Sequence, residues 1–502
     1  MRFSQRAGGS RVPWLLAPPS DAQRAAFSDA EPHPYWNDTL KPRDPHLPLE
    51  TALDCDLCIV GGGFTGLWAA LYAKQLDSQR SVVVLEASRC GAGASSRNGG
   101  FLNYSLTHGI SNGLERFPAE IGQIERLAMR NFDELVADLG AYGIEAEFEP
   151  TGELDVAVNS DQAAELAEAA ALAARYGQET ELMDRDRVRA EVHSPVYEGG
   201  LWYRSGAAMV NPAKLADGLR QAALAAGVQI FEHTRVSSLR WSGSQARPLA
   251  GRRPFSGDRQ GSASVIAVTD GGLVRARRVL LATNAYKPLL GRMRHFVAPV
   301  YDYVLVTEPL SAAQMESVGW NSRQGIGDSG NQFHYYRLTA DNRILWGGYD
   351  AVYRYGGPVR PDLDTDEHTF ARLSANFFTT FPQLEGVRFT HRWGGAIDTC
   401  SRFSVFFGRA FAGSVAYALG YTGLGVGASR FGGRTGVDLL DARRTQATGL
   451  ELVRRRPVPF PPEPLRSAVI QATRNRIEAA DRSGKRGLWL RTLDRFGVGF
   501  DS

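Results

Sequence analysis

The sequence predicts an α/β protein that combines a parallel βαβ unit with a second domain built on an antiparallel sheet. In the first unit, an apolar strand from Cys55 to Val60 leads into a helix from Phe64 to Leu76, and a second strand runs from Ser81 to Leu85. Residues 297–350 then contain several strand-like runs separated by turns. With 502 residues, the chain is long enough for two or three domains.

Composition places the chain among ordinary globular proteins and argues against several classes. Hydrophobic residues make up 43% and charged residues 22%, which allows a well-buried core. The net charge of +3 comes without a basic stripe, so no nucleic-acid partner is predicted. We find no apolar run long enough to span a membrane, and the early VPWLLAP stretch is too short for a signal-peptide core. A cytoplasmic protein is therefore expected.

The four cysteines are too few for a disulfide framework in a chain of this length. Cys55 and Cys58 form a C-x-x-C, but both lie in the first predicted strand, where residues three apart point to opposite faces. No second Cys or His pair stands nearby in the sequence to complete a metal site. We interpret both as buried structural thiols, and no metal is predicted.

The remaining elements follow the helical period of 3.6 or the strand period of 2. Residues 1–53 are rich in proline and polar residues and predict an irregular arm over the body, whereas the Gly/Ser/Arg/Pro-rich residues 241–263 predict a surface loop. Pro212 at the first turn and Gly227 at the end mark one helix. The predicted helices are 119–142, 161–176 and 211–227, and the predicted strands are 152–158, 228–239 and 265–282.

Toward the end of the chain, residues 413–440 return to a strand, a glycine-rich turn and a helix. The tail beyond Pro457 is first rich in proline and then basic, with apolar residues in a helical pattern. We interpret the tail as a helix packed on the body or on a partner subunit, which would allow a homo-oligomer to form through it.

A glycine-rich turn joins the first strand to the first helix. Gly61, Gly63 and Gly66 form a G-x-G-x-x-G, which in this context is typical of dinucleotide binding. Gly61 permits the tight turn, Gly63 lets the backbone approach a pyrophosphate, and Gly66 allows close packing of helix on strand. The start of the helix presents free N–H groups to the phosphates. Glu86, after the second strand, can accept hydrogen bonds from a ribose and would repel a 2′-phosphate, which disfavours NADP.

Two further glycine clusters, 91–101 and 420–427, have small side chains and free backbone N–H groups. Such segments can lie against a flat ring and its carbonyl oxygens. We find no second strand–GxGxxG–helix unit, which argues against a separate NAD(P)H domain. The fingerprint alone leaves FAD and NAD open.

Taken together, these segments resemble the glycine/D-amino-acid oxidase family of FAD enzymes over roughly residues 50–445. The resemblance rests on IVGGGFTGLWAALY, VVVLEASRCGAGASSRNGGF, LLATNAY, HRWGGAIDTCSRFSVFFG and ALGYTGLGVGASRFGGR. It implies a Rossmann-like FAD-binding domain interleaved with a substrate domain built on a large antiparallel β-sheet. The implied division is an arm (1–53), the FAD-binding domain (54–145, 206–296 and 411–445), the substrate domain (146–205 and 297–410) and a basic helical tail (446–502).

The resemblance also implies where the cofactor lies. The first glycine turn would hold the pyrophosphate and Glu86 the ribose, while Val236 would meet the adenine through its backbone. Thr283 would lie near the adenosine half, and Gly423 to Gly425 near the pyrimidine end of the flavin. The residues implied for FAD are Gly61, Gly63, Phe64, Thr65, Gly66, Glu86, Ala87, Ser95, Ser96, Arg97, Asn98, Gly99, Gly100, Val236, Thr283, Gly423, Leu424 and Gly425.

Some of the similar enzymes, the sarcosine oxidases, bind flavin covalently through a cysteine in the region that matches residues 391–408. Aligning the threonine-containing stretches places that cysteine near Ile397 and not at Cys400. Non-covalent FAD is therefore predicted, with Cys400 as a small, partly buried side chain.

Candidates for contact with a substrate come from the strand-rich segment. Aromatic rings there would favour the alkyl part of an amine and could hold a cation by cation–π contact. An arginine could bind a carboxylate bidentately, and a positive charge near the flavin would assist oxygen reduction. Ordinary sheet packing of the tyrosines and a surface ion pair of the arginine are the alternatives. The candidate catalytic residues are Tyr301, His334, Tyr336 and Arg337.

The reaction implied by the resemblance is the oxidation of a small amine or amino acid to an imine. The carbon beside the nitrogen gives a hydride to flavin N5, and O2 then reoxidises the flavin and forms H2O2. The alternatives are a dehydrogenase that passes electrons to a quinone or carrier protein, a flavin monooxygenase and a non-catalytic flavin-binding scaffold. The identity of the substrate stays open.

Overall fold

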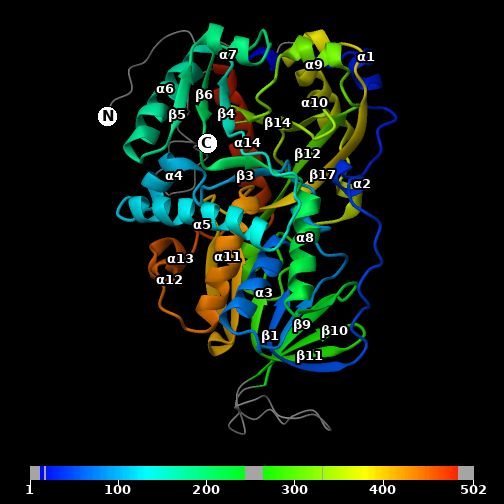
Figure 1. Cartoon of the computed structure of the whole chain (residues 1–502), viewed down its shortest axis with the longest axis vertical. Coiled ribbons are helices and arrows are strands. Elements are labelled where there is room, and N and C mark those ends of the chain that lie inside the picture. The colour runs from blue at the N-terminus through cyan, green and yellow to red at the C-terminus, as the bar shows by residue number, and fades with distance from the viewer. Residues whose placement is uncertain (1–11, 16–17, 243–263, 331, 484–502) are drawn as a thin grey trace.

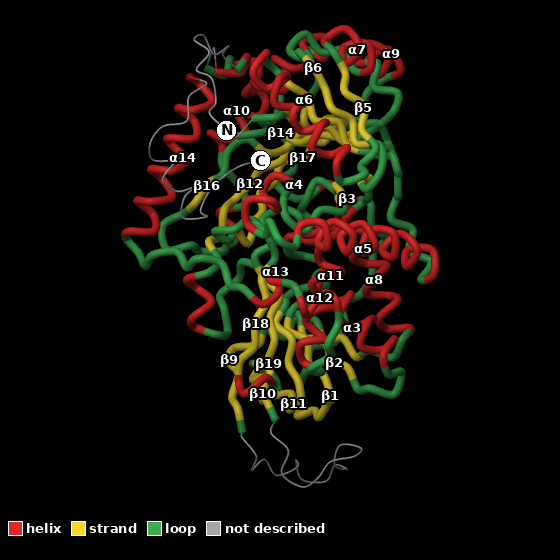
Figure 2. Tube along the Cα trace, turned by 90° about the vertical axis from the view of Figure 1, so that its left-hand side faces the viewer, coloured by secondary structure: helices red, strands yellow, loops and turns green. Residues whose placement is uncertain are grey.

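The computed structural model describes residues 12–15, 18–242, 264–330 and 332–483. Two sheets dominate this part of the chain, and a cartoon view places one sheet in each half of the molecule (Figure 1). Strands β1, β9, β10 and β11 lie in the lower half, whereas β4, β5, β6, β12 and β14 lie in the upper half. The turned view shows the same separation, with α5 and α11 near the level where the halves meet (Figure 2).

The first sheet contains the predicted βαβ unit. Its central strand β1 runs parallel to both β2 and β11, and β19 continues the parallel order beside β11. Parallel neighbours require crossover connections, and α3 supplies the one from β1 to β2. The strands are β1 (Ala52–Val60), β2 (Val82–Leu85), β8 (Gln229–Phe231), β9 (Val236–Trp241), β10 (Val265–Thr269), β11 (Leu273–Leu281), β18 (Phe406–Ala410) and β19 (Val415–Leu419).

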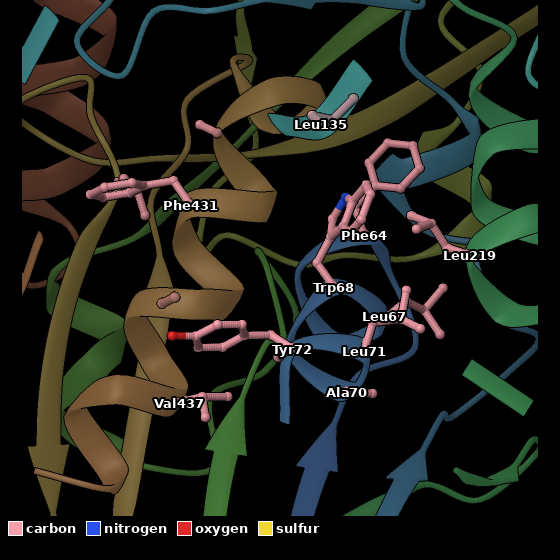
Figure 3. Close-up of a cluster of buried hydrophobic side chains, with 14 of the residues drawn as sticks. Phe64, Leu67, Trp68, Ala70, Leu71, Tyr72, Leu135, Leu219, Phe431 and Val437 are labelled. Carbon is pink, nitrogen blue, oxygen red and sulfur yellow. The ribbon is translucent and has the colours of Figure 1, made fainter. Parts of the chain in front are cut away.

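Helix α3 (Phe64–Leu76) is apolar on all sides because it lies between two other helices. Leu67 and Leu71 of α3 lie on the side of Leu219 from α8 (Pro212–Ala225), whereas Tyr72 points toward α11 (Gly425–Leu440) (Figure 3). Residues Phe64 to Ala73 are all buried. The start of α3 is thereby fixed against the sheet, which positions the preceding glycine turn.

The second sheet is mainly antiparallel, and β13 and β4 are parallel neighbours within it. Its strand order runs from β16 through β12, β15, β14, β13, β4 and β6 to β5, and β17 pairs with β12. Helix α10 (Glu367–Thr380) covers an aromatic core on one face. The strands are β4 (Glu153–Ala157), β5 (Thr180–Met183), β6 (Gly199–Tyr203), β12 (Ala298–Thr307), β13 (Gly325–Asp328), β14 (His334–Leu338), β15 (Ile344–Gly348), β16 (Val352–Tyr353) and β17 (Phe389–Thr399).

A two-stranded ribbon connects the glycine-rich segment after β2 to the chain that leads into α8. It pairs β3 (Phe101–Asn103) with β7 (Ala207–Met209) in antiparallel register. The remaining α-helices are α1 (Asp21–Ala25), α2 (Tyr35–Asp38), α4 (Gly109–Arg116), α5 (Ile121–Ala141), α6 (Ser160–Arg175), α7 (Arg185–Glu191), α9 (Ala312–Val318), α12 (Gln446–Gly449), α13 (Glu451–Arg454) and α14 (Leu465–Ser483).

Three predicted boundaries need correction. Strand β18 pairs with β19 in the first sheet, so residues 406–410 do not belong to the substrate domain as predicted. The predicted strand 228–239 is two strands, because the chain turns where Glu232 bonds to Arg43. The predicted strand 265–282 is the hairpin β10–β11, which turns after Thr269. Most of the predicted loop, residues 243–263, lies outside the described residues.

The arm and the tail both pack on the body of the molecule. Trp36 of the arm is fully buried, and its indole N–H donates to the Asn98 carbonyl at 2.9 Å. In the tail, α14 places Val469, Ile470 and Ile477 along the cavity described below. Association into a homo-oligomer through this tail stays a prediction. Within the described residues, no helix combines the length and apolar content needed to cross a membrane.

Candidate functional site

A cavity of about 1350 Å³ lies where the two sheets meet. One part of its wall follows the carboxyl ends of the parallel strands, at Gly61 after β1, Glu86 after β2 and Thr283 after β11. The other part comes from the second sheet, including β4, β12 and β14. Ligands of open α/β sheets bind at the carboxyl ends of the strands, so this cavity is the candidate site.

The glycine turn between β1 and α3 brings backbone, not side chains, to the cavity. Gly61 has φ +111°, and a Cβ atom at this position would overlap the carbonyl oxygen of Ala282. A Cβ atom on Gly66 would overlap the carbonyl oxygen of Gly61, so this glycine permits the close packing of α3 on β1. Gly63 is the residue before α3, and the start of this helix, where backbone N–H groups have no partner within the helix, lies next to the cavity. This cradle fits a pyrophosphate group.

Glu86 lies at the cavity wall directly after β2. Its Oε2 accepts the Gly62 N–H at 2.8 Å and its Oε1 accepts the Ser88 N–H at 2.9 Å. Burial raises the pKa of the Glu86 carboxyl, although the backbone N–H groups oppose that shift. The carboxyl group is thus fixed in orientation by backbone and retains lone pairs for the hydroxyl groups of a ribose.

The second glycine-rich segment, residues 91–101, is held in place by several elements. The Ser95 hydroxyl accepts the Phe64 N–H at 3.0 Å, which ties this segment to the start of α3. The indole N–H of Trp393 donates to the Arg97 carbonyl at 2.9 Å. A Cβ atom on Gly99 would lie 2.7 Å from the Tyr335 ring, so only glycine fits between the segment and the second sheet. The segment forms a close-packed wall between the two domains.

The third glycine-rich turn begins after β19 at Gly420. Asp398 accepts the Gly420 N–H at 2.6 Å and the Tyr421 N–H at 3.1 Å. Burial raises the pKa of Asp398 to about 7. His108 supports the same turn, because its Nε2 contacts the Thr422 carbonyl at 2.6 Å, and burial lowers its pKa to about 4. The neutral imidazole therefore donates its Nε2–H to that carbonyl.

These observations match a long cofactor with a pyrophosphate at its centre. The Gly61–Gly66 cradle, the oriented Glu86 carboxyl and the two further glycine-rich turns all face one cavity. The family model described as "FAD dependent oxidoreductase" matches residues 56–439, which is well over half of the chain. The chain belongs to this family. FAD is accordingly its cofactor, and the protein is an FAD-dependent oxidoreductase.

Individual members of the family support the assignment at the level of sequence and fold. The chain is 34% identical over 423 residues to γ-glutamylputrescine oxidoreductase of Escherichia coli, covering 82% of this chain and 90% of that protein. Glycine oxidase from Geobacillus kaustophilus superposes with a TM-score of 0.61 at 19% identity, covering 78% and 96% of the two chains. L-proline dehydrogenase from P. horikoshii gives the same TM-score at 16% identity, covering 80% and 96%.

Most residues predicted to contact FAD lie on the cavity wall. Gly66, Ser96 and Gly100 do not line it. Gly66 instead packs α3 on β1, and the Gly100 carbonyl faces Arg337. Ser96 lies behind the wall, beside Gly91. The predicted residues on the wall are Gly61, Gly63, Phe64, Thr65, Glu86, Ala87, Ser95, Arg97, Asn98, Gly99, Val236, Thr283, Gly423, Leu424 and Gly425.

Three of the four candidate substrate residues do not line the cavity, which corrects the prediction. His334 and Tyr336 are alternate residues of β14, and both point toward the aromatic core. There, His334 Nδ1 contacts Asp328 Oδ2 at 2.7 Å. The Tyr336 hydroxyl contacts the Tyr197 hydroxyl at 2.7 Å. Arg337 points the other way, toward the FAD-binding domain, and its Nη1 donates to the Val210 carbonyl at 2.7 Å. It ties the two domains together and is not among the residues that line the cavity.

Tyr301 is at the cavity wall but offers no free ring face. Its side chain is fully buried, and its hydroxyl accepts the Arg360 N–H at 3.1 Å. The predicted role of Tyr301 in substrate contact stays a proposal.

Sequence reasoning missed Tyr335 of β14 and Asp302 of β12, which also line the cavity. The Tyr335 hydroxyl donates to Asp302 Oδ2 at 2.6 Å, and burial raises the pKa of Asp302 to about 6. It also missed Glu153 and Asp155 of β4, which line the same wall. The sequence shows that side chains alternate between the two faces of each strand. It does not show which face lies toward the FAD-binding domain.

Proposed function

We propose that the chain oxidises the C–N bond of a small amine or amino acid to an imine, with O2 as the final oxidant. For a primary amine the balanced reaction is R–CH2–NH2 + O2 → R–CH=NH + H2O2. The substrate loses a hydride from carbon and a proton from nitrogen, and O2 takes up both hydrogens and both electrons. Bound FAD would supply the acceptor for the hydride.

The observation that carries this proposal is the shared cavity. Its glycine-rich wall suits the cofactor, and its second wall, from the antiparallel sheet, carries aromatic and carboxyl side chains. A substrate enclosed there would be held beside the cofactor and shielded from bulk water. The amine chemistry is supported by the relatives, which include the E. coli γ-glutamylputrescine oxidoreductase and the glycine oxidase named above.

Within the cavity, the chain's own groups set the geometry. The Asp302 carboxylate holds the Tyr335 hydroxyl, and the Tyr335 ring packs beside Gly99. We propose that this pair fixes the position of the substrate relative to the segment 91–101. Tyr335 and Asp302 act by positioning, because their hydrogen bond joins them to each other and not to the reacting atoms.

The proposal is tested by mixing the oxidised holoprotein with amines in the absence of air. The panel contains primary amines, N-methyl amino acids, glycine, proline and γ-glutamyl amines. At least one compound is expected to bleach the visible flavin band, and admission of air should restore it rapidly with one H2O2 per turnover. Slow recovery in air with fast recovery by a quinone would indicate a dehydrogenase. The absence of bleaching by every amine would contradict the proposal.

FAD is expected to be held non-covalently. Cys400 Sγ contacts the carbonyl oxygens of Ser404 at 3.2 Å and Gly420 at 3.4 Å, so its thiol is already engaged by the protein. Acid precipitation should therefore leave all of the flavin in the supernatant, and Cys400→Ser should retain the full flavin content. A coloured pellet from the wild type that becomes colourless in Cys400→Ser would contradict this expectation.

A further inference from the structure

A row of acidic side chains lines the part of the cavity bounded by the second sheet. Glu153 and Asp155 are alternate residues of β4, so their side chains leave the same face. On the neighbouring strand β13, Gly325 and Gly327 stand opposite Glu153 and Asp155 and add no side chains, whereas Asp328 stands opposite Val156, so its side chain leaves the other face of the sheet. Glu153 and Asp155 both belong to the cavity wall.

These carboxyl groups have few partners in the protein. Glu153 Oε2 accepts one hydrogen bond, from Asn103 Nδ2 at 2.8 Å. Across the described residues, Asp155 has neither a hydrogen bond nor a salt bridge through its side chain. The Asp328 carboxylate lies on the other face of the sheet, where its Oδ2 contacts His334 Nδ1 at 2.7 Å and its Oδ1 is buried. The partly buried carboxyl groups of Glu153 and Asp155 receive one hydrogen bond between them from the described residues, so this wall is suited to a ligand that supplies donors.

The carboxyl groups of Glu153 and Asp155 would be stabilised by a positively charged ligand. Burial raises the pKa of Asp155 well above its ordinary value, and the charges of Glu153 and Asp328 raise it further. Burial also raises the pKa of Glu153. A cation placed among these groups would favour their ionised forms and gain charge-assisted hydrogen bonds.

The cationic side chains of the cavity wall are engaged elsewhere or lie near the expected adenosine end. Arg97, Arg360 and Arg474 each bond to an aspartate, and Arg235 and Lys287 flank the segments around Val236 and Thr283. Among the described residues, neither Glu153 nor Asp155 forms a salt bridge with any of them. A substrate carboxylate would therefore be repelled from this part of the wall.

We propose that Glu153 and Asp155 form a subsite for a second cationic group of the substrate, distinct from the nitrogen that is oxidised. The preferred substrates are then diamines or longer oligoamines, and Tyr203, opposite Glu153 on β6, adds a ring face for the cation. This inference rests on the proposed amine oxidation and narrows it to a substrate class.

The test uses three small ligands of matched length: 1,4-diaminobutane, n-butylamine and 4-aminobutanoate. Their dissociation constants for the FAD-loaded protein are measured by calorimetry without air, and kcat/KM is measured in air. The wild type is expected to prefer the diamine over the monoamine by roughly ten- to a hundredfold in both quantities, the range of one charge-assisted contact. 4-Aminobutanoate should bind more weakly than n-butylamine.

The variants are Asp155→Asn, Glu153→Gln and the double variant, with Glu168→Gln as the matched control. Glu168 is exposed on α6, outside the cavity wall. In the double variant, the diamine should bind more weakly and react with a lower kcat/KM, so that its preference over the monoamine falls to near unity. The Kd and kcat/KM of the monoamine should change less than about twofold. Glu168→Gln should keep the wild-type preference. Asp155→Asn removes no hydrogen bond, so it reports on the subsite even if Glu153→Gln disturbs Asn103.

The outcomes separate the two proposals. The subsite is overturned if the wild type binds diamine and monoamine equally. It is also overturned if the double variant keeps the full diamine preference while its flavin content and melting temperature equal those of the wild type. If the diamine binds selectively but no amine bleaches the flavin, the proposed oxidation fails while the cation subsite stands.

Discussion

The two parts of the cavity wall use different chemical groups. The part predicted to face the cofactor is made largely of backbone from three glycine-rich turns, and its carboxyl group, Glu86, is fixed by backbone N–H groups. The part from the second sheet presents side chains, among them Glu153 and Asp155, which no cation of the described residues pairs. Backbone recognition suits a cofactor shared by a whole family, whereas side chains on a sheet can change without altering the fold.

Gly61→Ala should have the largest effect, because it tests the backbone part of the wall. The alanine would need φ near +111° and would overlap the Ala282 carbonyl. We expect a loss of about 2–5 kcal/mol in the free energy of unfolding, from backbone strain and overpacking, together with loss of FAD. Chemical denaturation and the flavin-to-protein ratio measure both effects.

Gly140→Ala is the matched control for that variant. Gly140 lies in α5 with open space around its Cβ position, so the substitution should raise or maintain stability. Wild-type flavin content and stability in Gly61→Ala would show that the turn does not need a glycine, and the comparison between the two walls would fail.

Arg337→Met should have the next largest effect, and on stability only. The substitution removes donors to the carbonyl oxygens of Val210 and Gly100 and leaves them buried without those partners. A loss of about 2–4 kcal/mol is expected, since each such group costs about 1–3 kcal/mol. The exposed Arg444→Met serves as the control.

A second measurement on Arg337→Met separates a domain tie from a substrate contact. The ratio of kcat/KM between substrates with and without a carboxylate should equal that of the wild type. A selective loss of carboxylate substrates would restore the role that the sequence predicted for this arginine.

Glu86→Gln should weaken FAD binding without unfolding the protein. An amide in place of the carboxyl gives up a charged acceptor and presents an N–H group where Gly62 or Ser88 donates. We expect FAD affinity to fall by roughly ten- to a hundredfold, the value of one hydrogen bond to a charged group. Fluorescence titration of the apoprotein with FAD measures the change, and Glu50→Gln, exposed and remote, should leave it intact.

His108→Asn should produce the smallest effect, a change in the pH dependence of stability. Burial lowers the pKa of His108 from 6.5 to about 4, so the unfolded chain binds more protons between these values. Its contribution is present above pH 6.5 and is lost as the pH falls toward 4, at most about 1–3 kcal/mol. His108→Asn should flatten this loss. His233→Asn, at an exposed histidine that also has positive φ, should not.

The cofactor part could be predicted from the sequence because its signals are local. The spacing of Gly61, Gly63 and Gly66 between an apolar strand and an apolar helix is readable within one short segment, and α3 has the predicted bounds. The hairpin β10–β11 replaces the single strand predicted over 265–282. The sequence is strand-like on both sides of the turn after Thr269, so the two strands resemble one longer strand.

The substrate part could be predicted only in outline. Strand β14 was expected, but its two faces carry His334 and Tyr336 on one side and Tyr335 and Arg337 on the other. Which face meets the cofactor depends on long-range pairing across the sheet, not on the strand's own pattern. The carboxyl groups of β4 and the contribution of α14 likewise arise from contacts between distant segments.

FAD is predicted to span this cavity from the glycine turn to the second sheet. A crystal structure of the yellow holoprotein tests this prediction directly. Pyrophosphate density is expected at Gly61–Gly63, the adenosine between Glu86 and Val236, and the flavin ring between residues 98–99 and Gly423, open to the acidic wall. Density for FAD outside this cavity, or with the flavin ring at the Val236 end, would contradict the account.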